Sequence, residues 1–430
     1  MKQLFIAWLF CTVAFLPGRG QVNYVNTRQG TNSRYEFSYG NTYPATALPF
    51  GMHTWTPQTG KNGDGWKYQY FVHTIRGFQQ SHQCSSWVND YAVFSLFPEA
   101  DKLVVNEDER AAAFKHENEI AQPGYYKVTF DNGIKTEFSP TERGAHFRFT
   151  FPSKKSIILL DGYTKMSQVK IDPVNRKISG YVNNARWVPP SFRNYFEITF
   201  DKPFKAYGTW ENKQNTIRAN EHEAEGEGIG AYIDFGNARQ IEAKVASSYI
   251  SPEQASLTLQ REVKGTFDET HAAADKIWNT LLSRMKVEGG TEEQKATFYS
   301  CLYHANLFSH QFFEYDKDGN PYYFSPYDGK IHQGYMYTDN GFWDTFRAQF
   351  PFFNLMYPSM NSHIMEGMVN AYKESGWLPE WASPGHRDCM IGSNSASLIA
   401  DAYLKGVRGF DINTAYESLR TPTTKVRWNQ

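Results

Sequence analysis

The stretch DETHAAADKIWNTLLSRMKV, residues 268–287, marks the point at which the hydrophobic period of the chain changes. Ile277, Leu281 and Met285 recur every four residues along it, which is the spacing of one face of an α-helix. The chain before this stretch alternates in the manner of strands, and the chain after it keeps the helical period. The sequence therefore predicts a β domain, a boundary near residue 265 and a helical region beyond it.

The segments before this boundary are short, alternate in polarity and are separated by Gly, Asn and Pro. YYKVTF, residues 125–130, alternates, Asp131-Asn132-Gly133 offers a turn whose glycine accepts a positive φ, and IKTEF, residues 134–138, resumes the pattern. The same alternation recurs in AHFRFTF, KSIILL, NYFEITF, KAYGTW, GAYIDF and IEAKVA. Many short strands with this punctuation predict an antiparallel β-sandwich.

The helical period continues after Gly289-Gly290 in TEEQKATFYSCLYHANLFSHQF and predicts an all-helical segment. The further helices predicted are 343–357, 360–375 and 394–406. The chain is thus predicted to be a multidomain β + α protein. Its predicted parts are a signal peptide at 1–20, a β-sandwich at 21–265, a helical linker at 266–290 and a helical domain at 291–430.

The N-terminal segment has the form of a secretory signal peptide. Met1-Lys2-Gln3 carries the positive charge, Leu4 to Leu16 is an apolar run too short to span a bilayer, and Pro17-Gly18-Arg19-Gly20 offers small residues after it. Cys11 lies inside the apolar run, so no lipid-accepting cysteine stands at the cleavage point. We expect an exported, soluble protein, either periplasmic or secreted.

Composition narrows the class of protein. With 40% hydrophobic residues, 21% charged residues and a net charge of −1, the chain suits a folded, water-soluble protein and suggests no nucleic-acid or membrane partner. Aromatic residues make up 16%, which suits either ring faces that stack on sugars or a ring-rich core. After the signal peptide only Cys84, Cys301 and Cys389 remain, without a CxxC pair, so neither a zinc site nor a disulfide framework is predicted, and at most one bridge can form.

The densest group of candidate functional residues lies between Tyr337 and Gly406. Trp343, Asp344 and Arg347 fall at i, i+1 and i+4, so a helix places Trp343 and Arg347 on one face and Asp344 about 100° round from Trp343. At a helix start beside a cavity, all three side chains could reach one ligand. The alternative is a core tryptophan beside a surface Asp-Arg pair.

Glu380 is a second candidate, because GWLPEW, residues 376–381, places it between two tryptophans. A carboxyl group beside apolar rings has a raised pKa suited to acid catalysis. A packed helix-cap region is the equal alternative. No metal site is predicted: Asp316-Lys317-Asp318-Gly319 lacks the glutamate that ends a calcium loop and favours a hairpin turn. The histidines without ligand spacing, expected to be satisfied by local partners, are His304, His310, His332 and His386.

Several motifs, taken in order, resemble glycoside hydrolase family 92, the calcium-dependent exo-acting α-mannosidases. They are NTYPATALPFGM (41–52), IRGFQQSHQCSSWVNDY (75–91), VASSYISPEQA (245–255), FWDTFR (342–347), GWLPEW (376–381) and MIGSNSASLIADAYLKG (390–406). The resemblance covers nearly all of the mature chain. It implies an N-terminal β-sandwich joined by linker helices to the first part of an (α/α)₆ barrel, with the active site between the two.

The resemblance also implies roles for single residues. Trp343 and Asp344 fall on positions that hold the non-reducing mannose, Arg347 completes the same motif, and Trp87 falls on an aromatic residue directed toward the leaving sugar. The loop ending at Pro49-Phe50-Gly51 is expected to approach the same cleft. The implied partner is a mannose-containing glycan, from which terminal α-1,2-linked mannose of N-glycans or mannans is removed by inverting, calcium-assisted hydrolysis.

The chain departs from the family pattern in its catalytic motifs. The family's general acid, calcium contacts and general base lie in Glu-Gly-Asn, Asn-Glu-Pro and Gly-Asn-Asp-Asp type motifs, and none of these occurs up to Gln430. We therefore expect a truncated or fragmentary member whose catalytic residues and most calcium ligands lie beyond Gln430, and which is inactive alone. A non-catalytic carbohydrate-binding protein and a glycan-releasing amidase remain as alternatives, although no Cys-His-Asp arrangement supports the amidase.

Overall fold

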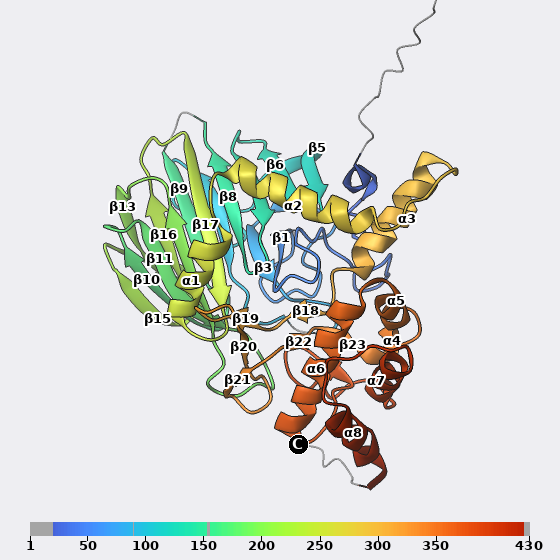
Figure 1. The fold of residues 1–430 in the computed structure, drawn as a ribbon. Helices are drawn as coiled ribbons and strands as arrows, with labels where there is room; N and C mark the ends of the chain where they lie inside the picture. The colour runs from blue at the N-terminus through green and yellow to red at the C-terminus, as the bar shows by residue number, and fades with distance from the viewer. Residues whose placement is uncertain (1–19, 89, 153–154, 425–430) are drawn as a thin grey trace, which may run out of the picture.

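The computed structural model describes residues 20–88, 90–152 and 155–424 (Figure 1). The predicted signal peptide lies outside the described residues apart from Gly20, which precedes the short 3-10 helix η1 (Gln21–Tyr24). Two large β-sheets occupy one side of the molecule with the first two α-helices against them, and the C-terminal α-helices occupy the other side (Figure 1). Among the described residues, no helix is both long and apolar enough to cross a membrane.

The β domain consists of two sheets whose paired strands run antiparallel. The seven-stranded sheet contains, in spatial order, β1 (Thr54–Gln58), β3 (Gly77–Ser81), β4 (Ser95–Ala100), β9 (Ser156–Asp161), β16 (Ile229–Asp234), β13 (Ala206–Glu211) and β14 (Thr216–Ala219). The ten-stranded sheet contains, in spatial order, β15 (Glu223–Glu227), β10 (Met166–Asp172), β11 (Lys177–Asn183), β12 (Asn194–Phe200), β17 (Gln240–Ser248), β8 (Gly144–Thr150), β7 (Lys135–Pro140), β6 (Tyr125–Phe130), β5 (Ala112–Gln122) and β2 (Thr74–Ile75). The predicted antiparallel β domain is confirmed.

Aromatic side chains from both sheets form one core. Trp55 of β1 meets Phe147 of β8 with ring centroids 5.0 Å apart, and Phe78 of β3 meets Phe138 of β7 at 5.7 Å. All four rings are fully buried. Because successive strand residues point to opposite sheet faces, the alternation seen in the sequence delivers these rings to the space between the sheets. Part of the high aromatic content is therefore core.

The hairpin predicted from the sequence is also confirmed. Tyr126 of β6 pairs with Phe138 of β7, and Gly133 in the connecting turn has φ of 85°. Only glycine adopts that backbone angle without a steric cost.

Helix α1 (Pro252–Glu262) lies inside the range 21–265 that the sequence assigned to the sandwich. Its start carries ordinary helix signals, since Ser251 accepts a hydrogen bond from the Gln254 backbone and Pro252 occupies the first turn. Strands therefore end at Ser248, earlier than expected. Helix α2 (Phe267–Leu282) then begins with a capping box.

The helical linker is fastened to the β domain through a buried tryptophan. Trp278 of α2 is fully buried and donates from Nε1 to the Ala47 carbonyl oxygen over 2.7 Å. Helix α3 (Glu292–Ala305) follows, also with a capping box, and its Tyr303 hydroxyl donates to the Ala45 carbonyl oxygen. These contacts join α2 and α3 to the same loop, and they hold the two parts of the molecule together.

The sequence predicted an all-helical segment after Gly289-Gly290. The structure instead has short strands after α3 and one more after α6. They are β18 (His310–Gln311), β19 (Glu314–Tyr315), β20 (Pro321–Phe324), β21 (Ile331–Gln333), β22 (Tyr337–Thr338), β23 (Asn340–Gly341) and β24 (Trp381–Ala382). The predicted turn at Asp316 to Gly319 joins β19 to β20, and Asp316 Oδ1 accepts from the Asp318 and Asn320 backbone N–H groups. Segments this short carry too few alternating residues to be distinguished from helix by period.

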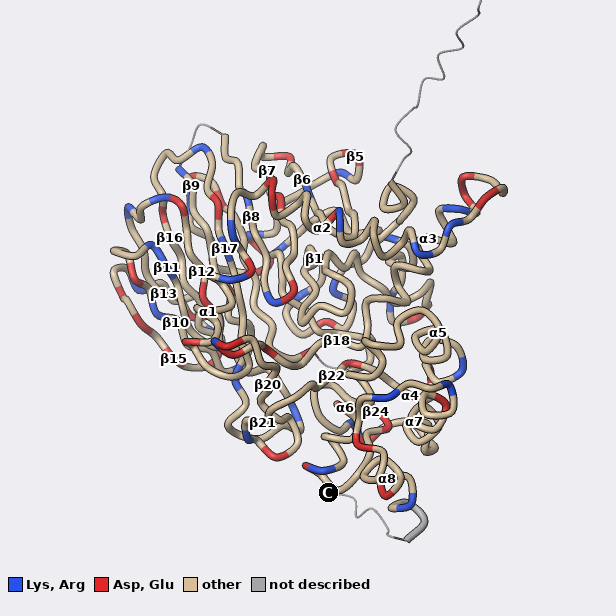
Figure 2. Tube along the Cα trace, viewed as in Figure 1, with Lys and Arg blue, Asp and Glu red and all other residues tan. Residues whose placement is uncertain are grey.

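The later helices are α4 (Phe342–Thr345), α5 (Gln349–Met356), α6 (Pro358–Ser375), α7 (Asn394–Leu404) and α8 (Ile412–Thr424). The single helix predicted over 343–357 is interrupted at Phe346–Ala348. Pro351 explains the break, because in a continuous helix its ring would clash with the carbonyl group of Arg347. Acidic and basic residues are interspersed over both parts of the molecule (Figure 2).

Glu314 is a buried carboxyl group where α1, β17 and β19 meet. Its Oε1 accepts from Ser248 Oγ at 3.0 Å and from the Tyr249 backbone N–H at 2.8 Å. Burial raises the pKa of Glu314 from about 4.5 to about 7, despite these hydrogen bonds and the nearby Arg143. Glu314 is therefore partly protonated at neutral pH.

We expect the stability effect of Glu314→Gln to depend on pH. Between pH 4.5 and 7 the folded protein holds a proton that the unfolded chain has released, so the Glu314 contribution to stability falls as pH rises. The glutamine variant lacks this loss, and its free energy of unfolding relative to the wild type should rise by about 1 to 3 kcal/mol from pH 5 to pH 8. Urea unfolding at both pH values measures this, and an unchanged difference would contradict it.

Candidate functional site

The start of α4 is held by a two-residue ladder. Strand β23 pairs with β24, which sets Gly341 opposite Trp381, and the Phe342 backbone N–H donates to the Glu380 carbonyl oxygen over 3.1 Å. The Trp381 ring packs directly against Gly341, since an added Cβ would lie 2.3 Å from it. Gly341 is therefore required for this approach, and the approach fixes where α4 begins.

Trp343 and Asp344 lie on α4 and Arg347 in the turn after it, and they do not form the Asp-Arg pair of the alternative interpretation. Arg347 lies over the half-buried Trp343, with Cζ 4.2 Å from the ring centroid, and donates from Nη1 to the Trp343 carbonyl oxygen. Among the ion pairs of the described residues, none joins Asp344 to Arg347. Asp344 is exposed, so an indole braced by a guanidinium stands next to a solvent-facing carboxylate.

Glu380 has a structural role that the helix-cap alternative predicted. Its Oε2 accepts from the Asn394 backbone N–H at 3.0 Å, and its Oε1 accepts from Ser395 Oγ at 3.2 Å. Both groups belong to the first turn of α7, where backbone N–H groups lack helical partners and favour negative charge. Both carboxylate oxygens of Glu380 are therefore engaged in holding α7, which argues against Glu380 as a catalytic acid.

Trp87 lies on the surface of the β domain rather than in its core. Its side chain is 63% exposed, and its ring meets those of Trp66 and Tyr35 edge-on, with centroids 5.3 and 5.6 Å away. Tyr35 is itself 71% exposed. The three rings form an open aromatic cluster, and edge-on contacts of this kind hold Trp87 while leaving ring surface available.

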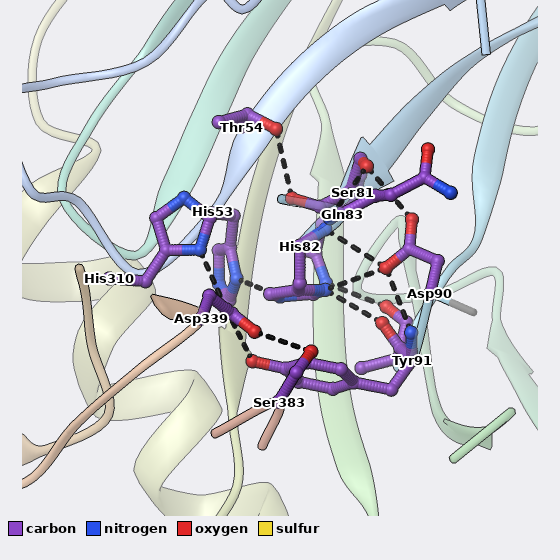
Figure 3. A network of polar contacts seen from close by, with 12 residues as sticks. His53, Thr54, Ser81, His82, Gln83, Asp90, Tyr91, His310, Asp339 and Ser383 are labelled. Atoms are coloured by element: carbon purple, nitrogen blue, oxygen red, sulfur yellow. Dashed lines mark hydrogen bonds and ion pairs between the residues drawn. The ribbon is translucent and has the colours of Figure 1, made fainter. Parts of the chain in front are cut away.

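A buried polar network lies beneath the loop that carries Trp87 (Figure 3). Asp90 accepts from Ser81 Oγ at 2.8 Å and from the backbone N–H groups of His82 and Tyr91 at 3.0 and 2.8 Å. It lies 3.3 Å from Lys67 Nζ. Burial alone would raise the pKa of Asp90, but the Lys67 charge and the His82 hydrogen bonds lower it to about 2. Asp90 is thus an ionised, buried carboxylate that fixes the end of this loop.

Two histidines extend the network. His82 Nδ1 lies 2.7 Å from the Tyr91 carbonyl oxygen, which can only accept, so we assign the proton to Nδ1. His82 Nε2 lies 2.8 Å from His53 Nδ1, so the two rings are hydrogen-bonded to each other. Burial lowers the pKa of His53 well below its usual value, which keeps that ring uncharged.

Asp339 joins the β domain to the helical region. It accepts hydrogen bonds of 2.8 Å from the Tyr91 hydroxyl, from His310 Nδ1 and from Ser383 Oγ (Figure 3). The three donors come from the Trp87 loop, from β18 and from the segment after β24, and Asp339 itself lies just before α4. One buried carboxylate therefore holds together the segments that carry Trp87 and Trp343. That Trp87 and Asp344 belong to one sugar-binding site stays a prediction.

Asp90 and Asp339 were not identified by the sequence analysis. Tyr91 and Asp339 are 248 residues apart, and no local spacing reports such a contact. A partial signal exists in the triplet Asp339-Asn340-Gly341, because Asp339 has φ of 61°, a left-handed conformation that Asp and Asn tolerate. For His310 the sequence predicted a locally satisfied histidine: its Nδ1 is bonded to Asp339, whereas its buried Nε2 has no hydrogen-bond partner among the described residues.

One group of potential metal ligands occurs within the described ranges. Ligand atoms of Asp328, His332 and Glu374 lie within 4.8 Å of one another. His332 Nε2 already lies 3.1 and 3.0 Å from the two Asp328 oxygens, and Glu374 accepts from the Tyr323 and Ser325 hydroxyls. Calcium prefers about six to eight oxygen ligands. An imidazole with two carboxylates that are already hydrogen-bonded does not fit it.

We expect calcium to leave the thermal stability of this chain unchanged. A cation bound only by the folded state would raise the melting temperature by mass action, and the group of three found among the described residues is not an oxygen-rich cage. Thermal melts in millimolar calcium chloride and in EGTA should therefore coincide. A rise of several degrees in calcium, lost in Glu374→Gln, would show that the group of three does bind the ion.

Comparison with known proteins places this architecture among the glycoside hydrolases. Residues 24–248 match the family model for the N-terminal domain of glycosyl hydrolase family 92, and residues 254–430 match that for the family's catalytic domain. The chain therefore belongs to glycosyl hydrolase family 92. The first family model ends at the last residue of β17, and the second begins inside the first turn of α1.

Similar solved structures agree. A family 92 inverting mannosidase from Bacteroides thetaiotaomicron is 46% identical, with a TM-score of 0.91 over 93% of this chain and 55% of that one. A family 92 α-mannosidase from the same organism is 28% identical, with a TM-score of 0.85 over 95% and 58%. A secreted glycosidase of Arthroderma benhamiae, itself uncharacterised, is 22% identical over 88% of this chain and 50% of its own length. The chain thus spans roughly half the length of these relatives.

Proposed function

We propose that the chain provides the sugar-binding part of an exo-acting α-mannosidase that removes terminal α-1,2-linked mannose from N-glycans or mannans with inversion. The observation that carries this proposal is the 46% identity, over 93% of the chain, to a family 92 inverting mannosidase. The proposed domains are a β-sandwich over 21–265, a linker over 266–290 and a partial (α/α)₆ barrel over 291–430. Export to the periplasm or beyond belongs to the same proposal.

The chemistry of α4 supports the proposed roles. Asp344 is an exposed carboxylate that can accept hydrogen bonds from two neighbouring mannose hydroxyls. Trp343, braced by Arg347, offers an aromatic surface beside it. Trp87 offers a second, 63% exposed ring for the leaving sugar. Together these groups would bind two sugar rings, and Asp344 is proposed to bind the sugar rather than to act as the catalytic acid or base.

Inversion needs two carboxyl groups about 6.5 to 9.5 Å apart, one to protonate the glycosidic oxygen and one to activate a water molecule on the opposite face. The motif types that in the family carry both groups and the contacts to its calcium ion do not occur among these 430 residues. That ion, when bound, would polarise sugar hydroxyls and favour ring distortion.

An amidase is less well supported, because its thiol nucleophile would need a lowered pKa. Burial raises the pKa of the Cys84 thiol well above its usual value, and burial also raises that of Cys389. A non-catalytic sugar-binding protein keeps the same site residues and differs only in lacking turnover.

The stereochemistry of the product tests the proposal. The complete gene product, incubated with α-1,2-mannobiose in calcium and followed by proton NMR from the first minutes, should release β-mannose first. Release of α-mannose first would overturn inversion. Failure to release mannose at all would favour the non-catalytic alternative.

A further inference from the structure

Trp187 is an exposed tryptophan in a conformation that bulky residues seldom adopt. It lies in the loop between β11 and β12, its side chain is 71% exposed, and its φ is 56°. The left-handed region is unfavourable for a residue with a large side chain, and such residues persist there when the surroundings impose the conformation. Strained positions of this kind concentrate at ligand-binding sites.

A buried arginine holds one side of the Trp187 ring. Arg387 Cζ lies 5.0 Å from the ring centroid, and the Arg387 side chain belongs to a residue that is only 5% exposed. A guanidinium at this distance is attracted to the face of an indole ring. The ring is therefore fixed from beneath while most of its surface faces solvent.

The same arginine is tied to the segment that positions Asp344. The Arg387 backbone N–H donates to the Trp381 carbonyl oxygen over 2.9 Å, and Trp381 belongs to the β23–β24 ladder that leads into α4. Cys389 follows two residues after Arg387. Burial is the main cause that raises the pKa of the Cys389 thiol, and the negative charge of Asp344 raises it further. Arg387 thus links the Trp187 loop of the β domain to the segment that leads into α4.

We propose that Trp187 is a sugar-stacking surface for a ring beyond the terminal mannose, so that the site recognises mannose-containing glycans of more than one residue. This inference rests on the proposed function, because it takes Asp344 as the group that holds the terminal mannose. The apolar C–H face of a pyranose matches an indole face that is rigid and open on one side. Stacking on a ring that is already immobilised costs little conformational entropy.

A purely structural role for Trp187 would leave a different surface. A tryptophan that only shields Arg387 from water would be expected to bury its own ring, as Trp278 and Trp55 do. Trp187 instead exposes 71% of its side chain. The exposed Trp187 ring therefore suits ligand stacking rather than the shielding of Arg387 from water.

Ligand-observed NMR titration of the 430-residue chain tests the inference with two probes, methyl α-mannoside and α-1,2-mannotriose. Trp187→Ala should weaken mannotriose about five- to tenfold and methyl α-mannoside less than twofold, because only the longer probe reaches the Trp187 ring. Trp187→Phe keeps a ring face and should recover most of the mannotriose affinity. Tyr181→Ala is the matched control, since Arg193 Cζ lies 4.9 Å from the Tyr181 ring in a comparable pair with no left-handed backbone.

Every outcome of this titration either supports or overturns the inference about Trp187. Unchanged affinities for both probes in Trp187→Ala overturn the inference and leave the proposed function standing. Equal losses for both probes that track a lower melting temperature assign Trp187 a structural role and also overturn it. If the wild type binds neither probe, the proposed sugar site fails, and the inference fails with it.

Discussion

The 430-residue chain is expected to release no measurable mannose from α-1,2-mannobiose or from aryl α-mannosides, with or without calcium. Inverting hydrolysis needs a general acid and a general base, each worth about 10² to 10⁴ in rate. The family's motif types for both are absent from these residues, and Glu380, the candidate within them, uses both carboxylate oxygens to hold α7.

Purified chain at high concentration, assayed for free mannose over a day, gives the measurement. The family 92 inverting mannosidase from Bacteroides thetaiotaomicron, assayed under the same conditions, is the positive control. Turnover by the 430-residue chain that a chelator abolishes would show that the acid and base lie within it. Asp344 and Glu380 would then be the first carboxyl groups to replace.

Asp344→Ala in the complete gene product is expected to lower kcat/KM for α-1,2-mannobiose between tenfold and several hundredfold. A carboxylate that accepts from two sugar hydroxyls makes charge-assisted hydrogen bonds worth roughly 1.5 to 3 kcal/mol each, and some of this is recovered by water in the variant. Because Asp344 is exposed and makes no ion pair with Arg347, its removal should leave the melting temperature unchanged. Asp318→Ala, an exposed carboxylate on the β19–β20 turn, is the matched control.

Trp87→Ala separates the leaving-sugar role from general binding. The variant should lose more kcat/KM on mannobiose than on an aryl mannoside, since only the disaccharide presents a sugar to the Trp87 ring. Trp87 is 63% exposed, so little stability should be lost. Uniform losses on both substrates, in step with a lower melting temperature, would remove Trp87 from the site.

Local patterns in the sequence predicted much of the fold. The hairpin around Gly133 and the capped helix α2 depend on turn residues, alternation and helical period within a few residues of each other. Where single helices and strands begin or end at other residues than predicted, a local signal accounts for the difference. Ser251 and Pro252 start a helix inside the range assigned to strands, and Pro351 divides a helix that periodicity alone would have continued.

The supports of the candidate site could not be predicted in this way. Trp343, Asp344 and Arg347 were identified because they lie within five residues of each other in the sequence. Asp339, which joins that helix to the Trp87 loop, has partners 29, 44 and 248 residues away. Contacts of that range are set by the packing of the β domain against the helical region, and no spacing in one sequence encodes them.

The most direct test of the account is whether this chain binds mannose through Asp344. Methyl α-mannoside titrated into the purified wild type should give saturable binding in ligand-observed NMR, and Asp344→Ala should weaken it at least about tenfold at an unchanged melting temperature. Equal affinities in the wild type and the variant, or no binding by the wild type, would contradict the assignment of a mannose site to α4.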